Sequence, residues 1–304
     1  MKKIFIVAAA AIALASCSKT ENEHSPVGQK EIKFTNLNDK VISRAANDNS
    51  DNYQVYADWS GSSTEWFINA AINGTTNLAP TTYYWPASGT VDFYSWAPST
   101  IAATGAYPAL SIAYTVPAAA NQDFTVAAPQ LAKSSGIVAF EFAHMLSKVS
   151  VTASLHQDLL DAGYVLSTTG LTATLKVLST GGTVDPKTTP AAWTSPNATA
   201  ATYTGAASYM IMPQGAVGCK VQITAGITIT KNGTEIYSGG LSEYEIAAGD
   251  ITEFAMGKHY MLNLTIGDAS TGGGGEDIFN VIQFSANTTP WDTPGGTDTP
   301  LVQP

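Results

Sequence analysis

The chain has 304 residues, of which 44% are hydrophobic and only 12% are charged. This composition excludes an intrinsically disordered protein, and the length is sufficient for two domains with buried cores. The formal net charge of −10 at pH 7 argues against nucleic acid as a partner, because a negative protein repels a phosphate backbone. Abundant small and hydroxyl residues together with 10% aromatic residues favour short strands and turns, and they predict an all-β fold.

The N-terminus has the pattern of an export signal. Lys2 and Lys3 precede twelve apolar residues, 4–15, whereas a membrane-spanning helix needs about 20. The run ends in Leu14-Ala15-Ser16-Cys17, which resembles the bacterial lipobox, where cleavage leaves an acylated cysteine as the new N-terminus. We therefore expect residues 1–17 to be a lipoprotein signal peptide and Cys17 to be the lipid attachment site. An ordinary signal peptide with an incidental cysteine is the alternative.

Residues 18–44 are mostly polar and suit a tether, with one strand-like piece inside it. Residues 31–35 alternate so that Ile32 and Phe34 share one face. Arg44 follows, and it is the only arginine in the sequence. A protease of strict arginine specificity would therefore have one cleavage site, between Arg44 and Ala45.

Alternating apolar residues predict the later strands, and turn residues separate them. In chain order these strands are 91–96, 111–116, 124–127, 137–151, 172–178, 208–212, 217–230, 259–266 and 278–286. The break at 134–136 suggests a boundary between two domains. Within 137–151 the apolar phase changes, so we expect a bulge or bend near Ser147.

Three local signals punctuate the second half of the chain. Residues 154–157 could cap one short helix that runs to about Ala162. Asn232-Gly233 predicts a two-residue hairpin turn, because both residues tolerate positive φ angles. Gly272 to Gly275 is expected to form a flexible linker before the last strand.

No motif in the sequence points to catalysis, to a metal ion or to a cofactor. Zinc-binding spacings, a nucleophile elbow and a phosphate-binding loop are all missing from the sequence. His144 lies on an apolar strand face and is interpreted as a structural histidine, while Cys219 shares the phase of Val221 and is interpreted as a core residue. Paired carboxylates such as Asp158 and Asp161 are ordinary surface acids. The sequence therefore predicts a protein that is not an enzyme.

The segment from residue 53 to residue 98 is rich in aromatic residues and leaves two interpretations open. Its tryptophans could stack on sugar rings if they were exposed, but their alternation with other apolar residues favours packing in a core. These tryptophans are Trp59, Trp66, Trp85 and Trp96.

Taken together, these features resemble the fimbrillins, or type V pilins, of anaerobic Gram-negative gut and oral bacteria. The resemblance extends over nearly the whole chain. No single motif decides it, but the order and spacing of the motifs are specific to the family. The residues that carry it are the lipobox at Cys17, Ile32-Lys33-Phe34 before Arg44, Tyr84-Trp85-Pro86, the stretch 91–98, the stretch 142–149, the stretch 260–266, Ile282-Gln283-Phe284 and Trp291.

The resemblance implies a fold of two transthyretin-like β-sandwich domains in tandem, here at 45–134 and 135–284, followed by a tail at 285–304. It implies a lipoprotein precursor that reaches the outer membrane, where an arginine-specific surface protease removes the segment up to Arg44. A strand from another fimbrial subunit then fills the place of Ile32 and Phe34, and the subunits form an adhesive fimbrium.

The sequence does not decide which strand of a subunit is donated to the next subunit. Ile282, Phe284 and Ala286 are candidate donor residues, but the same strand could simply complete its own sandwich. A surface lipoprotein that binds glycans through the tryptophans is the alternative function.

Overall fold

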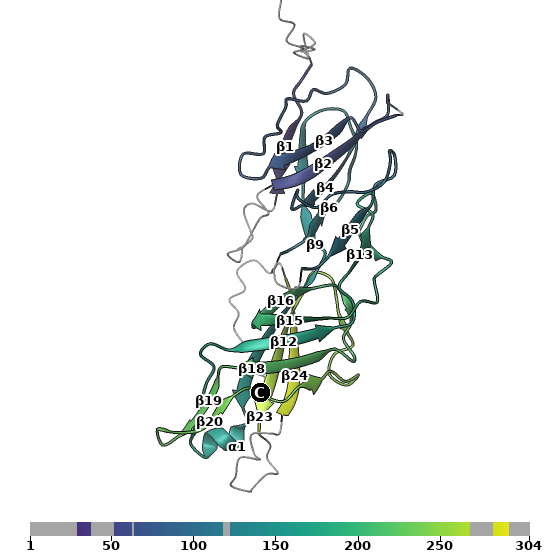
Figure 1. Cartoon of the computed structure of the whole chain (residues 1–304). Coiled ribbons are helices and arrows are strands. Elements are labelled where there is room, and N and C mark those ends of the chain that lie inside the picture. The colour runs from purple at the N-terminus through teal and green to yellow at the C-terminus, as the bar shows by residue number, and fades with distance from the viewer. Residues whose placement is uncertain (1–28, 38–51, 63, 118–121, 268–281, 292–304) are drawn as a thin grey trace, which may run out of the picture.

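The computed structural model describes residues 29–37, 52–62, 64–117, 122–267 and 282–291. Cys17, Arg44, Ala45 and the glycines 272–275 lie outside the described residues. Within these ranges the chain consists of many strands and one short helix, which confirms the all-β fold class. The strands form an elongated molecule, with β1 to β3 near one end and α1 near the other (Figure 1).

A six-stranded sheet lies in the half of the molecule that holds the first strands (Figure 1). Its central strand β4 pairs antiparallel with β2, β6 and β7. Six of the seven residues of β4 are buried, because both faces of the strand are covered. The members of the sheet are β2 (Asn52–Trp59), β3 (Ile68–Asn73), β4 (Val91–Ala97), β6 (Thr125–Ala127), β7 (Gln130–Lys133) and β9 (Phe142–His144).

The single long strand predicted over residues 137–151 is wrong. The structure divides it into β8 (Ile137–Phe140), β9 and β10 (Ser147–Leu155), which belong to three different sheets. Met145 and Leu146 are both buried, so the in-and-out alternation stops where the chain passes from one sheet to the next. The expected change in the alternation of apolar residues near Ser147 is therefore present. It marks the break between β9 and β10, and not a bulge or bend within one strand.

A four-stranded sheet forms the centre of the other half, in the order β16, β10, β23, β24. Strand β10 runs parallel to β23 and antiparallel to β16. Strand β24 pairs antiparallel with β23 along its full length, from Ile266 opposite Ile282 to Lys258 opposite Pro290. The bounds of the new strands are β16 (Ser208–Ile211), β23 (Lys258–Ile266) and β24 (Ile282–Pro290).

Smaller sheets complete the fold around these two. One contains β11 (Tyr164–Ser167), β19 (Ile227–Lys231) and β20 (Thr234–Gly239); another contains β12 (Thr172–Val177), β15 (Ala201–Ala206), β18 (Lys220–Ala225) and β21 (Tyr244–Glu245). A third contains β5 (Ile112–Thr115), β13 (Gly181–Val184) and β14 (Trp193–Thr194), and β17 (Gln214–Gly215) pairs with β22 (Glu253–Phe254).

The predicted hairpin turn and short helix are confirmed, whereas one predicted strand is wrong. Asn232 and Gly233 have φ angles of 53° and 79° and join β19 to β20 as a hairpin. The helix α1 (Gln157–Asp161) begins after His156, whose side chain accepts a hydrogen bond from the Asp158 backbone N–H. The predicted strand 217–230 is instead two strands, because Gly226 takes a φ of 89° and turns the chain between β18 and β19.

Buried hydrophobic side chains gather in two clusters. The smaller cluster includes Ile32 and Phe34 together with residues of β2, β3, β4 and β8. The larger cluster lies around the four-stranded sheet and contains Cys219, as the sequence predicted for that residue. The larger cluster also contains Ile112 and Phe124, which precede the boundary predicted at 134/135. Strand β5, before that boundary, pairs with β13, after it. The domain boundaries drawn from the sequence therefore stay predictions.

Candidate functional site

The first described segment of the chain fills a cleft in the smaller core. Ile32 and Phe34 are 4% and 6% exposed, while Glu31 and Lys33, on either side of Ile32, face solvent. This is the alternation that the sequence predicts for a strand with one buried face. It makes residues 30–36 an integral part of the core, although they precede the rest of the fold in sequence.

Backbone hydrogen bonds hold this segment on two sides. The Ile32 N–H donates to the Tyr83 carbonyl at 2.8 Å, and the Trp85 N–H donates to the Lys30 carbonyl at 2.9 Å. Further along, β1 (Lys33–Asn36) pairs in parallel with β8, from Lys33 opposite Ile137 to Asn36 opposite Phe140. Among the described strands, β8 has β1 as its only ladder partner. Loss of β1 would therefore leave the backbone N–H and C=O groups of β8 without the strand that they pair with here.

Aromatic contacts fix the position of Phe34. Its ring lies parallel to that of Phe140 with centroids 6.3 Å apart, and it meets Phe93 edge-on at 6.2 Å. Phe93 also contacts the ring of Trp85 at 5.7 Å. Removal of Phe34 would thus expose the rings of Phe93 and Phe140, which are otherwise buried.

A hollow of about 420 Å³ runs along the β1 segment. It is lined on one side by Ile32 and Phe34 and on the other by the chain from Thr76 to Tyr83. Leu78 in that chain is 64% exposed. The cleft that β1 occupies is therefore open to solvent along one side even while β1 is in place.

The candidate donor residues lie on β24, at the edge of the four-stranded sheet. Ile282, Phe284 and Ala286 are half-buried and share one face, and they pack against the larger core. The Phe284 ring stacks on Tyr244 with centroids 4.8 Å apart. In the state described here, β24 completes the sheet of its own chain, which is one of the two alternatives that the sequence left open.

The four tryptophans of the aromatic segment do not form a common surface. Trp85 and Trp96 are 3% and 0% exposed, so neither can stack on a sugar. Trp59 is half-buried, packs on Phe67 and donates its Nε1–H to the Ser88 carbonyl. Trp66 is half-buried and meets Tyr56, Tyr94 and Tyr107 edge-on. These positions favour the core-packing interpretation.

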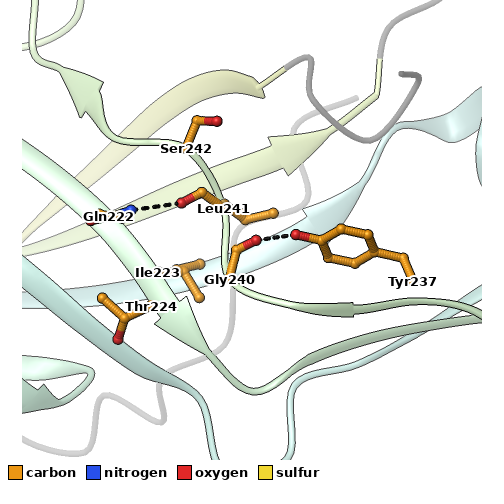
Figure 2. A pocket seen from close by; sticks show the side chains of 7 residues that line it. All are labelled: Gln222, Ile223, Thr224, Tyr237, Gly240, Leu241 and Ser242. Atoms are coloured by element: carbon orange, nitrogen blue, oxygen red, sulfur yellow. Dashed lines mark hydrogen bonds between the residues drawn. The ribbon is translucent and has the colours of Figure 1, made fainter. Parts of the chain in front are cut away.

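A second hollow, of about 410 Å³, lies beside the segment that joins β20 to β21 (Figure 2). The Tyr237 hydroxyl donates to the Gly240 carbonyl, and the Gln222 side-chain amide donates to the Leu241 carbonyl at 3.1 Å (Figure 2). Tyr237 and Gln222 thus hold the backbone of Gly240 and Leu241, while the Thr224 hydroxyl donates to the Thr172 carbonyl at 3.2 Å.

Chemistry-bearing side chains do not assemble elsewhere in the described residues. No group of three or more potential metal ligands occurs among them. Burial raises the pKa of the Cys219 thiol to about 11, so its reactive thiolate form is disfavoured at neutral pH. Across the same residues, the helices are too short or too polar to span a membrane.

Comparison with known protein families identifies the family of this chain. A family model described as fimbrillin-like matches residues 40–291. The chain belongs to the fimbrillin-like family. This family is one of fimbrial structural proteins. None of the curated protein sequences compared with this fimbrillin-like chain matches it.

Solved structures share the fold at low sequence identity. A protein from Bacteroides uniformis that is assigned to cell adhesion aligns with a TM-score of 0.56 at 17% identity, covering 86% of this chain and 99% of the other. A fimbrial protein from Bacteroides vulgatus aligns with a TM-score of 0.56 at 13% identity and the same two coverages. The fimbrillin-like chain is therefore similar in fold to both over almost their whole length.

Proposed function

We propose that this fimbrillin-like chain is a structural subunit of a cell-surface fimbrium that polymerises by exchange of a strand between subunits. The proposal assigns β1 as a temporary plug in the cleft of the smaller core. Cleavage between Arg44 and Ala45 makes that plug removable, and the freed cleft accepts a strand from another subunit. The resulting fimbrium would serve adhesion.

The burial of Ile32 and Phe34 carries this proposal. Burying a large apolar side chain contributes about 1.5–3 kcal/mol, so the two together contribute roughly 3–6 kcal/mol to the folded precursor. An incoming strand with two matching side chains recovers the same contribution. It also restores the backbone ladder on β8, as in β-strand addition.

The last strand has the side chains that this cleft accepts. Residues 32–36 read Ile-Lys-Phe-Thr-Asn, and residues 282–287 read Ile-Gln-Phe-Ser-Ala-Asn. In both strands an isoleucine and a phenylalanine lie two positions apart on the inner face, and a hydroxyl residue follows. This match supports an arrangement in which Ile282 and Phe284 of one subunit take the places of Ile32 and Phe34 in the next, with Ala286 following on the same face.

A strand donated from one subunit to the next is a head-to-tail contact, and such a contact does not close on itself. It therefore builds a filament. Loss of residues 1–44 leaves twenty acidic residues and seven lysines, a net charge of −13 at pH 7. Filaments with this charge would repel one another and stay dispersed.

The same proposal includes the route to the surface. Acylation of Cys17 would hold the precursor at the outer membrane, and an arginine-specific surface protease would release it from that lipid. The partners are other fimbrial subunits, identical or different, and no cofactor is required.

Limited digestion of the purified precursor with an arginine-specific protease tests the proposal. We expect one stable product that begins at Ala45, followed by a ladder of higher oligomers. Arg44→Lys is the matched control, because it keeps the positive charge but removes the cleavage site; it should stay monomeric and folded. Oligomers of equal size and yield from Arg44→Lys would refute the processing step.

A further inference from the structure

The side chain of the residue that follows β24 packs on another sheet. The Trp291 ring stacks on the His144 ring with centroids 3.9 Å apart and planes 8° from parallel. Its backbone N–H donates to the Gly257 carbonyl at 3.0 Å. His144 belongs to β9 of the six-stranded sheet, whereas β24 belongs to the four-stranded sheet. The stack therefore connects the end of the last strand to a separate sheet.

The His144 ring is held in place independently of Trp291. It is 7% exposed, and its Nδ1 lies 2.5 Å from Oδ2 of Asp123. The other oxygen of Asp123 accepts a hydrogen bond from the Phe124 N–H at 2.8 Å. His144 also pairs with Thr125 in the β6–β9 ladder. Because both its backbone and its ring are fixed, His144 presents a rigid flat surface to the tryptophan.

The rest of β24 is held less firmly than its neighbours. Strand β24 is the last strand of its sheet, and each of its residues is half-buried or exposed. Strand β10, in contrast, has β16 on one side and β23 on the other. An edge strand with little burial opens at lower cost than a central one. The stack of Phe284 on Tyr244 and the stack of Trp291 on His144 are the aromatic contacts that hold this edge strand.

We propose that Trp291 is a latch that keeps β24 on its own sheet through its stack on His144, with Asp123 orienting the histidine. The inference rests on the proposed function, in which β24 must leave this sheet to enter the cleft of another subunit. The latch would limit how often the donor strand is exposed in a subunit that has not yet met an acceptor.

Hydrogen exchange of the intact full-length chain tests the latch without requiring assembly. The Trp291→Ala variant should exchange the β24 amides at least roughly tenfold faster than the parent, because an aromatic pair and its buried area are lost. Exchange at the β10 amides should stay within about threefold. Trp291→Phe, which keeps a ring for stacking, should restore most of the protection in β24.

Trp59→Ala is the matched control, since Trp59 is also half-buried and packs on one aromatic ring, that of Phe67. It should leave exchange in β24 unchanged. The latch is refuted if Trp291→Ala leaves β24 protection unchanged, or if protection falls equally in β10 and β24, which would indicate a general loss of stability.

Assembly after protease treatment separates the latch from the proposed function. If the latch limits donor release, cleaved Trp291→Ala protein forms oligomers faster than the cleaved parent. Failure of the cleaved parent to form any oligomer would overturn the proposed function but leave the exchange result standing. Normal assembly with unchanged β24 exchange would overturn the latch alone.

Discussion

Phe34 lies parallel to Phe140, with ring centroids 6.3 Å apart and planes 12° from parallel. The two residues are on β1 and β8, which pair in a parallel ladder although about a hundred residues separate them in sequence. Under the proposed function, only Phe140 stays with the mature subunit. Phe140 therefore lies on the surface where, under the proposed function, a donated strand replaces β1.

Truncation of Phe34 should strongly destabilise the precursor. Phe34→Ala removes a buried ring that packs on Phe93 and Phe140, and such changes cost about 3–5 kcal/mol. Urea unfolding measures the loss in free energy of unfolding. Leu37→Ala is the control, because Leu37 is 53% exposed and should change that free energy by less than about 0.5 kcal/mol. Equal effects from the two variants would contradict the assigned burial.

Truncation of Phe284 should impair assembly more than folding. In the precursor Phe284 is half-buried, whereas in the acceptor cleft it would take the fully buried place of Phe34. After cleavage at Arg44, we expect Phe284→Ala to form oligomers at least tenfold more slowly in light scattering. Gln283→Ala changes the exposed face of the same strand and should assemble at the parental rate. If both variants assemble normally, β24 is not the donor strand.

Gly240→Ala should destabilise the fold through a backbone clash. A Cβ at this position would lie 2.5 Å from the Thr224 carbonyl oxygen and 2.6 Å from that of Ile223. The segment beside the hollow in Figure 2 must then move, at a cost of about 1–3 kcal/mol in the free energy of unfolding. Gly249→Ala is the control, because a Cβ there meets nothing within 4 Å. A melting temperature unchanged by Gly240→Ala would contradict the close approach.

Stability should fall on the alkaline side because several tyrosines are buried. Burial raises the pKa of Tyr203 and Tyr209 to about 12, from an ordinary value of 10.0. Between these values the unfolded chain loses phenolic protons that the folded chain keeps. Rising pH therefore favours unfolding, and this part of the stability is complete below about pH 10. Melting temperatures recorded from pH 8 to pH 11.5 should fall above pH 10.

Tyr203→Phe provides the check on that pH dependence. The Tyr203 hydroxyl is buried and has no hydrogen-bond partner among the described residues, so its removal should cost little stability at pH 8. The variant should lose less stability than the parent between pH 10 and pH 11.5. A steeper loss in Tyr203→Phe than in the parent would show that the hydroxyl stabilises the alkaline form.

Local features of this protein followed from the sequence because they depend on neighbouring residues. The alternation at Ile32 and Phe34 predicted one buried face, and Asn232-Gly233 predicted the hairpin between β19 and β20. The predictions that failed were lengths of strands. Residues 137–151 and 217–230 each contain a point where the chain changes sheet or turns, and periodicity over one window does not reveal what the chain pairs with.

The candidate site could be predicted only in part for the same reason. The sequence by itself contains the single arginine and determined the buried face of the first strand, and it predicts the export signal. Tertiary structure alone decided that Phe34 lies between Phe93 and Phe140, that β24 pairs with β23, and that Trp291 reaches His144. A residue pattern specifies which face of a strand avoids water, but the groups that cover this face come from distant segments, and only the folded chain brings them together.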